Sequence, residues 1–385
     1  MKKIKTPSFI IRKEKLENQT NDLMKTLSET FPFYIAGYSF KTNNFSWIIS
    51  YMREKGLWAE TVSSDEYTLA KSLGFPINRI IFNGPAKGKA EFIEAVENGA
   101  IVNIDSKREL KWLKECNSST QNIWKIGLRV NFDIEEQCPG ESQGGTEDGR
   151  FGFSLENGEL TDAINFMIAN KFPFSGIHLH CSSKTRSLNI YKAISAIAVK
   201  IVKTFNLNLN FLDIGGGFFG GVPGKPSFHD YFVEIKKILA STINLEKTTI
   251  IVEPGISLIG CAVDYVTQVI DVKETKHNHF TLLDGSRTHI DPLMRKSSYT
   301  YHIEQSETSS KKFVNQILCG FTCMENDRFF HLNYAPLKEG DLVVFENVGA
   351  YTMGLSPQFI EAYPRVYVEE QGHFELVRKK QKLPL

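Results

Sequence analysis

A lysine at the end of an apolar segment is the first feature of this sequence that could do chemistry. Lys41 follows residues 33–38, an aromatic and apolar run after Pro32 that is typical of a short buried strand. Burying an ammonium group is costly and lowers its pKa, so an amine in this position can attack a carbonyl. The alternative is that Lys41 has left the strand and extends its charged end to water.

Two further apolar segments end in groups that would complement a reactive lysine. The run Gly215, Gly216 and Gly217 follows such a segment, and its backbone N–H groups could converge on a phosphate. A flexible surface turn is the alternative, and the run does not match the dinucleotide-binding glycine pattern. Glu253 ends another apolar segment and could hold a protonated ring nitrogen, unless it is an ordinary surface glutamate.

Two histidines, His178 and His180, stand at alternate positions of one expected strand and would share a face. Zinc has to be considered at such a pair, but no carboxylate or cysteine lies at a spacing that would complete a site, so we expect no metal. Flat stacking of His180 on a ring cofactor is the competing interpretation. A strand-end lysine, a glycine run and a strand-end acid together meet the needs of pyridoxal 5'-phosphate: a covalent attachment, a phosphate site and a partner for the protonated pyridine.

The elements that must position these residues alternate from about residue 30 to residue 250. Short apolar segments are each followed by an amphipathic one, and about eight such units are present. The pattern predicts an α/β fold, a TIM-type (β/α)8 barrel, with an open doubly wound sheet as the alternative. After about residue 255 apolar residues recur with period two, which predicts a C-terminal antiparallel β-domain.

The composition supports a globular protein of two domains and excludes several other classes. The chain has 385 residues, of which 42% are hydrophobic and 23% charged, and its net charge of +1 argues against binding nucleic acid. No apolar run approaches the roughly 20 residues of a membrane span, and no apolar segment follows the basic N-terminus, so we expect no membrane association and a cytoplasmic location. Gly140, Gly144, Gly145 and Gly149 lie in a polar stretch that predicts an exposed loop.

With these motifs identified, the sequence resembles the fold-type III pyridoxal-phosphate decarboxylases, the group of diaminopimelate and ornithine decarboxylases. The likeness runs from about residue 30 to residue 360, and the matching motifs stand in the family's order. They are the cofactor-lysine motif at 38–43, a strand and loop at 60–66, Arg-Phe-Gly at 150–152, His-Cys-Ser-Ser at 180–183, the glycine run from 213, Glu-Pro-Gly at 253–255, Cys-x-x-x-Asp at 323–327 and a tyrosine motif at 346–351.

The resemblance implies a division of the chain and an assembly. It implies a pyridoxal-phosphate-binding barrel over residues 29–254 and a β-domain over residues 255–385, which the N-terminal segment 1–28 completes. It also implies a head-to-tail homodimer with shared active sites, in which Lys41 comes from one subunit and Cys323 from the other.

The resemblance further implies a mechanism and a set of site residues. The substrate amine displaces Lys41, the protonated ring absorbs the carbanion left by loss of CO2, and Cys323 protonates Cα. Lys41 and Cys323 are therefore the expected catalytic residues. The expected cofactor-binding residues are Lys41, His180, Ser183, Gly215, Gly216, Gly217, Glu253, Gly255 and Tyr351.

Departures from the family's pattern bear on the substrate, which we expect to be a small amino-acid-like molecule. Ile256 stands where the family usually has arginine, and Met324 stands where related enzymes have an acidic residue. Arg295 and Tyr299 keep a pair that resembles the carboxylate clamp of the diaminopimelate enzymes, in a stretch that Arg287 and His289 also make basic. The expected substrate-binding residues are therefore Arg295, Tyr299 and Met324, unless these charges face solvent.

We therefore expect a decarboxylase of an amino acid or amino-acid conjugate with an anionic distal group, in a siderophore- or antibiotic-type pathway. Three alternatives stay open: diaminopimelate decarboxylase of lysine biosynthesis, an amino-acid racemase or epimerase on the same barrel, and a non-catalytic binding relative. Retention of Cys323, Asp327 and the long β-domain favours decarboxylation over racemisation, and retention of Lys41 and Cys323 argues against a non-catalytic relative.

Overall fold

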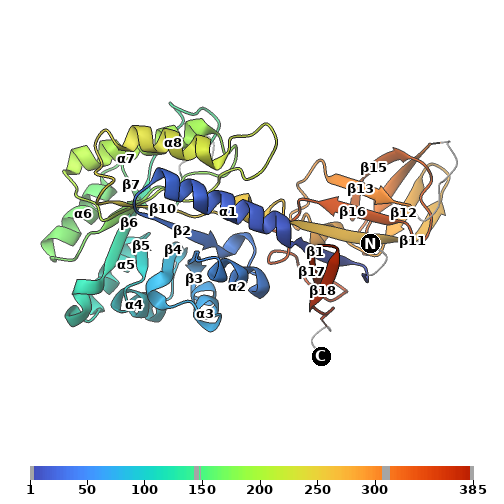
Figure 1. The fold of residues 1–385 in the computed structure, drawn as a ribbon, viewed down its shortest axis with the longest axis horizontal. Coiled ribbons are helices and arrows are strands. Elements are labelled where there is room, and N and C mark those ends of the chain that lie inside the picture. Colours follow the sequence, from blue (N-terminus) through green and yellow to red (C-terminus); the bar gives the residue numbers. More distant parts are fainter. Residues whose placement is uncertain (1–3, 143–146, 148, 306–312, 382–385) are drawn as a thin grey trace. The chain divides into compact units, whose positions relative to one another are not determined.

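The chain divides into two compact units. The computed structural model describes residues 4–142, 147, 149–305 and 313–381, so Gly144 and Gly145 of the expected exposed loop lie outside the described residues. One unit, here called the barrel unit, is Gln19–Ser257, and the other, the β unit, is Met1–Asn18 with Leu258–Leu385 (Figure 1). In the described part of the chain no helix has the length and apolar character needed to cross a membrane.

Eight parallel strands close on themselves in the barrel unit, because the last of them pairs with the first. In order around the barrel they are β2 (Tyr34–Ser39), β3 (Trp58–Ser63), β4 (Ile80–Ala86), β5 (Ile101–Ile104), β6 (Lys125–Asn131), β8 (Gly176–His178), β9 (Phe211–Asp213) and β10 (Thr249–Val252). A short strand, β7 (Phe153–Ser154), pairs with β6 outside this circle. The prediction of a TIM-type barrel is confirmed, and the open sheet is not formed.

Helices connect the strands, as parallel pairing requires. They are α1 (Lys13–Thr30), α2 (Ser46–Glu54), α3 (Ser64–Ser72), α4 (Lys89–Glu97), α5 (Lys107–Trp112), α6 (Glu159–Ala169), α7 (Leu188–Phe205), α8 (Phe228–Leu239) and α9 (Ile256–Ile259), with 3-10 turns η1 (Phe40–Thr42), η2 (Ile77–Arg79), η3 (Leu113–Glu115), η4 (Ser118–Ile123) and η5 (Arg287–His289). Local signals fix their starts: Ser227 and Asp230 form a capping box at α8, and the Ser63 hydroxyl accepts from the Glu66 N–H at α3.

Large and small residues alternate across the interior of the barrel. The ring of Phe211 packs with Ile81, Ile101 and Ile251 in a buried cluster near the amino ends of the strands. A Cβ atom on Gly176 would lie 2.5 Å from this ring, so the strand beside Phe211 has to carry a glycine there. This apolar layer fills one end of the barrel and leaves the carboxyl ends of the strands for polar groups.

The β unit is a single nine-stranded sheet. Its strands are β1 (Ser8–Arg12), β11 (Val263–Glu274), β12 (His279–Leu283), β13 (Thr300–Glu304), β14 (Val314–Cys319), β15 (Arg328–Tyr334), β16 (Leu342–Glu346), β17 (Arg365–Glu370) and β18 (His373–Arg378). Pairing is mostly antiparallel, and β1 lies between β11 and β17. The N-terminal segment therefore completes the C-terminal sheet, as predicted, and Ile10 packs with Val266 and Val344 in its core.

Candidate active site

Polar side chains gather at the carboxyl ends of the barrel strands. The strand register places Ser39 beside Glu60, and His178 beside both Arg129 and Asp213. Because parallel strands in register end at one level, these side chains form a single polar layer above the apolar cluster. The residues of this layer are Ser39, Glu60, Asn83, Asn103, Arg129, His178, Asp213 and Glu253.

Lys41 lies in the 3-10 turn η1, directly after β2, and faces a buried carboxylate. Its Nζ donates to Oε2 of Glu60 at 3.1 Å, and Oγ of Ser39 donates to the same oxygen at 2.5 Å. The side chain of Glu60 is fully buried, whereas 40% of the Lys41 side chain is exposed. The lysine therefore has a counter-charge in Glu60, and part of its side chain is accessible from outside the barrel unit.

Glu253, His178 and Asp213 form a buried cluster in which one ligand atom of each residue lies within 4.8 Å of the others. Nε2 of His178 is 3.5 Å from Oε2 of Glu253. Neither ring nitrogen of His178 forms a hydrogen bond within the described residues. The spacing argument from the sequence did not show these carboxylates beside His178, because they come from other strands.

The pKa values of the two carboxyl groups of this cluster are shifted in opposite directions. Burial, and then the charge of Glu253, raises the pKa of Asp213 well above its usual range. Burial acts the same way on Glu253, but His178 and Lys41 outweigh it and lower the pKa of Glu253. Glu253 is therefore an ionised acceptor beside a neutral Asp213, which is the arrangement that a protonated ring nitrogen requires.

Hydrogen-bond donors already occupy oxygens of these carboxyl groups. Asn83 donates to Oε1 of Glu253, and Asp213 accepts from Asn103 at 3.0 Å and from the Gly215 N–H at 2.9 Å. These three bonds leave Oε2 of Glu253 without one of the donors named here, and a carboxylate oxygen can accept more than one donor. Glu253 can therefore accept a further N–H donor such as a ring nitrogen.

The glycine run forms a close backbone cradle beside this cluster. Gly215 and Gly217 have φ values of +70° and +97°, a region that favours glycine. A Cβ atom on Gly216 would lie 2.0 Å from the carbonyl oxygen of Glu253, and one on Gly217 would lie 2.8 Å from Oγ of Ser183. The run therefore brings bare backbone and the Ser183 hydroxyl to one place, as phosphate binding requires.

His180 and Gly255 flank the same space. The ring of His180 is nearly parallel to that of His178, at 19°, with ring centroids 6.4 Å apart. Burial, with the positive charges of Lys41 and Arg129, lowers the pKa of His180 to about 3, so its ring is neutral and can lie flat against an aromatic cofactor. A Cβ atom on Gly255 would lie 2.1 Å from Oγ1 of Thr42, so Gly255 packs against the turn that holds Lys41.

Together these residues fit pyridoxal phosphate. The cofactor would supply an aldehyde for Lys41 and a pyridine ring that withdraws electrons, and the chain supplies the cradle for its phosphate and the carboxylate for its ring nitrogen. The structure brings together Lys41, His180, Ser183, Gly215, Gly216, Gly217, Glu253 and Gly255 within the barrel unit.

The remaining expected site residues belong to the β unit. Cys323 is exposed in a tight turn that Asp327 builds. Oδ2 of Asp327 accepts from the hydroxyl of Thr322 at 2.7 Å, and its N–H donates to the carbonyl of Met324 at 2.9 Å. Tyr351 is also exposed, and its φ of +56° is unusual for a non-glycine residue.

Asp291 organises the loop that carries Arg295 and Tyr299. It accepts from the Arg287 guanidinium at 2.8 Å, from the hydroxyl of Tyr299 at 3.2 Å and from the backbone N–H of Arg295 at 2.9 Å. The Arg287 backbone N–H also donates to Oδ1 of Asp327 at 2.8 Å. The Arg295 loop and the Cys323 turn are thus joined through Arg287.

This loop is less basic than the sequence suggested. The charge of Arg287 is taken up by Asp291, and His289 is buried against the hydroxyl of Tyr265 at 2.5 Å. Burial, with the charges of Lys380 and Arg378, lowers the pKa of His289 to about 4, so that it is neutral. Arg295 is exposed, and within the described residues no carboxylate pairs with its side chain.

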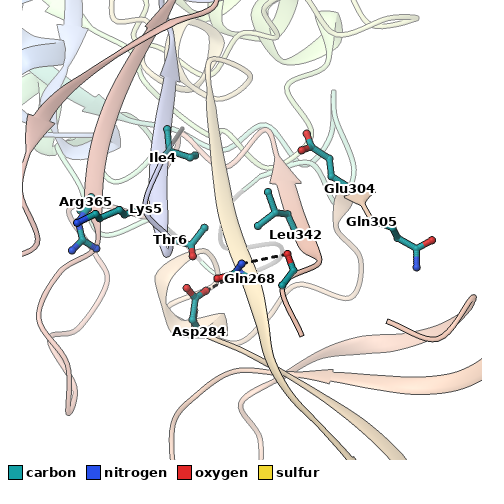
Figure 2. Close-up of a pocket in the computed structure, with 10 residues that line it drawn as sticks. Ile4, Lys5, Thr6, Gln268, Asp284, Glu304, Gln305, Leu342 and Arg365 are labelled. Atoms are coloured by element: carbon teal, nitrogen blue, oxygen red, sulfur yellow. Dashed lines mark hydrogen bonds between the residues drawn. The ribbon is translucent and has the colours of Figure 1, made fainter. Parts of the chain in front are cut away.

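The β unit also contains a cavity of about 720 Å³ (Figure 2). Asp284 lies on its wall and accepts from the backbone N–H of Gln268 at 2.8 Å, while the Gln268 side chain donates to the carbonyl of Gly340 at 3.3 Å. These groups hold strands together, and none of the expected site residues lines the cavity. Its lining residues are Ile4, Lys5, Thr6, Gln268, Asp284, Glu304, Gln305, Gly340, Leu342 and Arg365.

A buried ion pair supports the strand ends that form the polar layer. Nζ of Lys87 lies 2.9 Å from Oε2 of Glu109, both side chains are fully buried, and burial lowers the pKa of Lys87 although Glu109 opposes it. The same Glu109 oxygen accepts from the backbone N–H of Asp105 at 3.0 Å. The pair therefore fixes the chain after β4 to the chain after β5.

We expect Lys87→Met to lower the free energy of unfolding by about 3–5 kcal/mol, because it leaves the Glu109 charge buried without a partner. Urea unfolding measures the change. The matched control is Lys89→Met, whose partner Glu115 is half exposed, as Lys89 is, and which should cost less than about 1 kcal/mol. Equal losses in both variants would show that the Lys87 pair has no special role.

Comparison with known proteins identifies the class. Residues 13–260 match the family described as pyridoxal-dependent decarboxylase, pyridoxal binding domain. The match covers the barrel and the whole polar layer, and the chain belongs to this family. It is a pyridoxal-phosphate-dependent amino-acid decarboxylase, a carboxy-lyase.

Individual relatives span nearly the whole chain. A diaminopimelate decarboxylase of Aquifex aeolicus is 26% identical over 375 residues, 94% of this chain and 87% of the relative. An L-glutamyl-[BtrI acyl-carrier protein] decarboxylase of Niallia circulans is 26% identical over 407 residues, 98% of this chain and 92% of the relative. The fold is similar to that of a diaminopimelate decarboxylase from M. jannaschii in complex with L-lysine, with a TM-score of 0.83 and 22% sequence identity. The two structures match over 99% of this chain and 91% of the other.

Several residues of the polar layer were not among those expected from the sequence. Glu60, Asn83, Asn103 and His178 contact the expected residues directly, or through one another. The available signal was the position of each polar residue in, or directly after, an otherwise apolar segment, as in Ile-Ile-Phe-Asn at 80–83. In a barrel, that position is the carboxyl end of a strand.

Proposed function

We propose that this enzyme removes the α-carboxyl group of an amino acid or amino-acid conjugate with an anionic distal group, in a specialised biosynthetic pathway. The exposed Arg295, which has no carboxylate partner within the described residues, carries the proposal. Its backbone is fixed by Asp291, so the guanidinium is available to bind a carboxylate or phosphate of the substrate. Tyr299, anchored on the same aspartate, would stand beside it.

Two apolar residues support a substrate that lacks a second amino-acid centre. Ile256 opens α9 directly after Gly255, and Met324 follows Cys323. Neither side chain can bind an ammonium group or a carboxylate. The likeness to an L-glutamyl-carrier decarboxylase, over 98% of this chain, supports a conjugated amino acid in particular.

Diaminopimelate decarboxylation is the second candidate. It is favoured by the likeness to the Aquifex aeolicus enzyme and by the pair Arg295 and Tyr299. In that case the substrate would carry a free amino-acid centre at its distal end, and Ile256 would have to be tolerated beside it.

Measuring CO2 release with a substrate panel tests the proposal. The panel contains meso-diaminopimelate, L-lysine, L-ornithine, L-glutamate, and glutamate joined through its side chain to a carrier or to a small thiol. We expect turnover of a member whose distal end is anionic, and a KM about tenfold higher in Arg295→Ala with kcat little changed, because one charge-assisted contact is lost. Turnover of meso-diaminopimelate alone, or an unchanged KM in Arg295→Ala, would contradict the proposal. The control is Lys338→Ala, which removes another exposed cation.

We further propose that the active site is shared in a homodimer. The proposal is supported by a segment of the β unit near the tyrosine motif that exposes Tyr351, Leu355 and Ile360, at 41%, 49% and 51%. Tyr351 and Ile360 also have positive φ values, of 56° and 51°. Strained backbone of this kind persists where surrounding contacts hold it, and a second copy of the chain would supply them here.

A further inference from the structure

One asparagine lies between the two carboxylates of the polar layer. Asn83, in the middle of β4 (Ile80–Ala86), is 2% exposed. Its amide nitrogen donates to Oε1 of Glu60 at 3.0 Å and to Oε1 of Glu253. Glu60 is the partner of Lys41, and Glu253 is the acid placed to hold the ring nitrogen. A single side chain therefore contacts both.

The orientation of the Asn83 amide is fixed by its other partner. Oδ1 of Asn83 accepts from Nδ2 of Asn103 at 2.9 Å, and Asn103 also donates to Asp213 at 3.0 Å. Turning the amide over would place its oxygen against two carboxylate oxygens and its nitrogen against another donor. The two N–H bonds of Asn83 are thus directed one to each carboxylate.

A neutral bridge has a consequence that a charged one would not have. The amide donates a hydrogen bond to each carboxyl group but carries no charge of its own, so it adds no charge to the buried site. A change in the charge or donor capacity at Asn83 therefore acts on both carboxylates at once.

We propose that Asn83 is a positioning residue that couples the Lys41 end of the site to the ring-nitrogen end by holding the carboxyl groups of Glu60 and Glu253 at fixed places. The inference rests on the assignment of Lys41 and Glu253 to the cofactor. Asn83 acts through its two carboxylate partners, Glu60 and Glu253.

Asn83→Asp tests this coupling, because aspartate has nearly the same shape but no amide hydrogens. If the new carboxyl group is ionised, it adds a negative charge near Lys41 and donates to neither glutamate. If it is protonated, it has one O–H donor in place of the two N–H donors of asparagine. We expect the pH midpoint of the visible absorbance of the bound cofactor to rise by about one unit or more. The dissociation constant of pyridoxal phosphate, measured by titrating the apoprotein, should rise about tenfold, the equivalent of one lost hydrogen bond to a charged group.

The control is Asn98→Asp, at the exposed C-terminal end of α4, where the side chain donates to the carbonyl of Glu94. Asn83→Ala adds no charge, so it keeps the test valid if the aspartate variant does not fold, and the same weaker cofactor binding is expected. A midpoint and a dissociation constant equal to those of the wild type would overturn the proposal. A wild-type protein without a visible band would instead overturn the cofactor site itself.

Discussion

A Lys41→Ala variant is expected to lose the visible absorbance of the bound cofactor and at least about 10⁴-fold in kcat/KM, the scale seen when a covalent catalytic group is removed. Lys41 supplies the amine that donates to Glu60 of the polar layer. Without it, the glycine cradle, Ser183, His180 and Glu253 would hold the cofactor with no covalent bond to the chain. Absorbance spectra and CO2 release measure the two effects. The control is Lys111→Ala, at an exposed position. An intact visible band in Lys41→Ala would show that this lysine does not bind the cofactor covalently.

The same variant tests the shared site. If Lys41 of one subunit works with Cys323 of the other, neither Lys41→Ala nor Cys323→Ala is active alone. After the two are mixed and allowed to exchange subunits, about one quarter of wild-type activity should return, because half of the dimers are mixed and each has one intact site. If both residues of a site came from one chain, no mixed dimer would contain an intact site and no activity would return.

The fold could be predicted from the sequence because its signals are local. Apolar segments alternating with amphipathic ones imply parallel strands and helices, and about eight such units imply closure. The glycine run could also be predicted, since a backbone cradle requires consecutive residues without Cβ atoms. A Cβ atom added to Gly216 would lie 2.0 Å from the carbonyl oxygen of Glu253. This position therefore requires glycine, and the requirement is visible in the sequence.

The contacts inside the site could not be predicted, because they join residues far apart in the chain. Asn83 and Glu253 are separated by 170 positions, and no spacing rule reaches that distance. The prediction that the loop carrying Arg295 is basic was too strong for a related reason. Counting Arg287 and His289 as basic ignored their partners: Asp291 takes up the first charge, and burial against Tyr265 keeps the second residue neutral.

Glu253→Gln is expected to lower kcat about 10²- to 10³-fold at neutral pH, the loss typical of removing one preorganised electrostatic contact in an active site. Glutamine keeps the shape and can still accept from Asn83, but it has no charge with which to hold a proton on the ring nitrogen. Lys41 is unchanged, so the cofactor should still bind and show its visible band. The KM should change little, since Glu253 faces the cofactor and not the substrate.

The pH dependence separates this role from a structural one. Because the pKa of Glu253 is lowered, its carboxylate stays ionised throughout the neutral pH range. The activity of the wild-type enzyme should therefore not change in this range through protonation of Glu253. In Glu253→Gln the ring nitrogen has to take its proton from solvent, so the remaining activity should rise as the pH falls. The control is Glu54→Gln, at an exposed position of α2. A uniform loss of activity at every pH in Glu253→Gln would indicate damaged packing. A wild-type kcat in Glu253→Gln would show that the ring nitrogen has another partner.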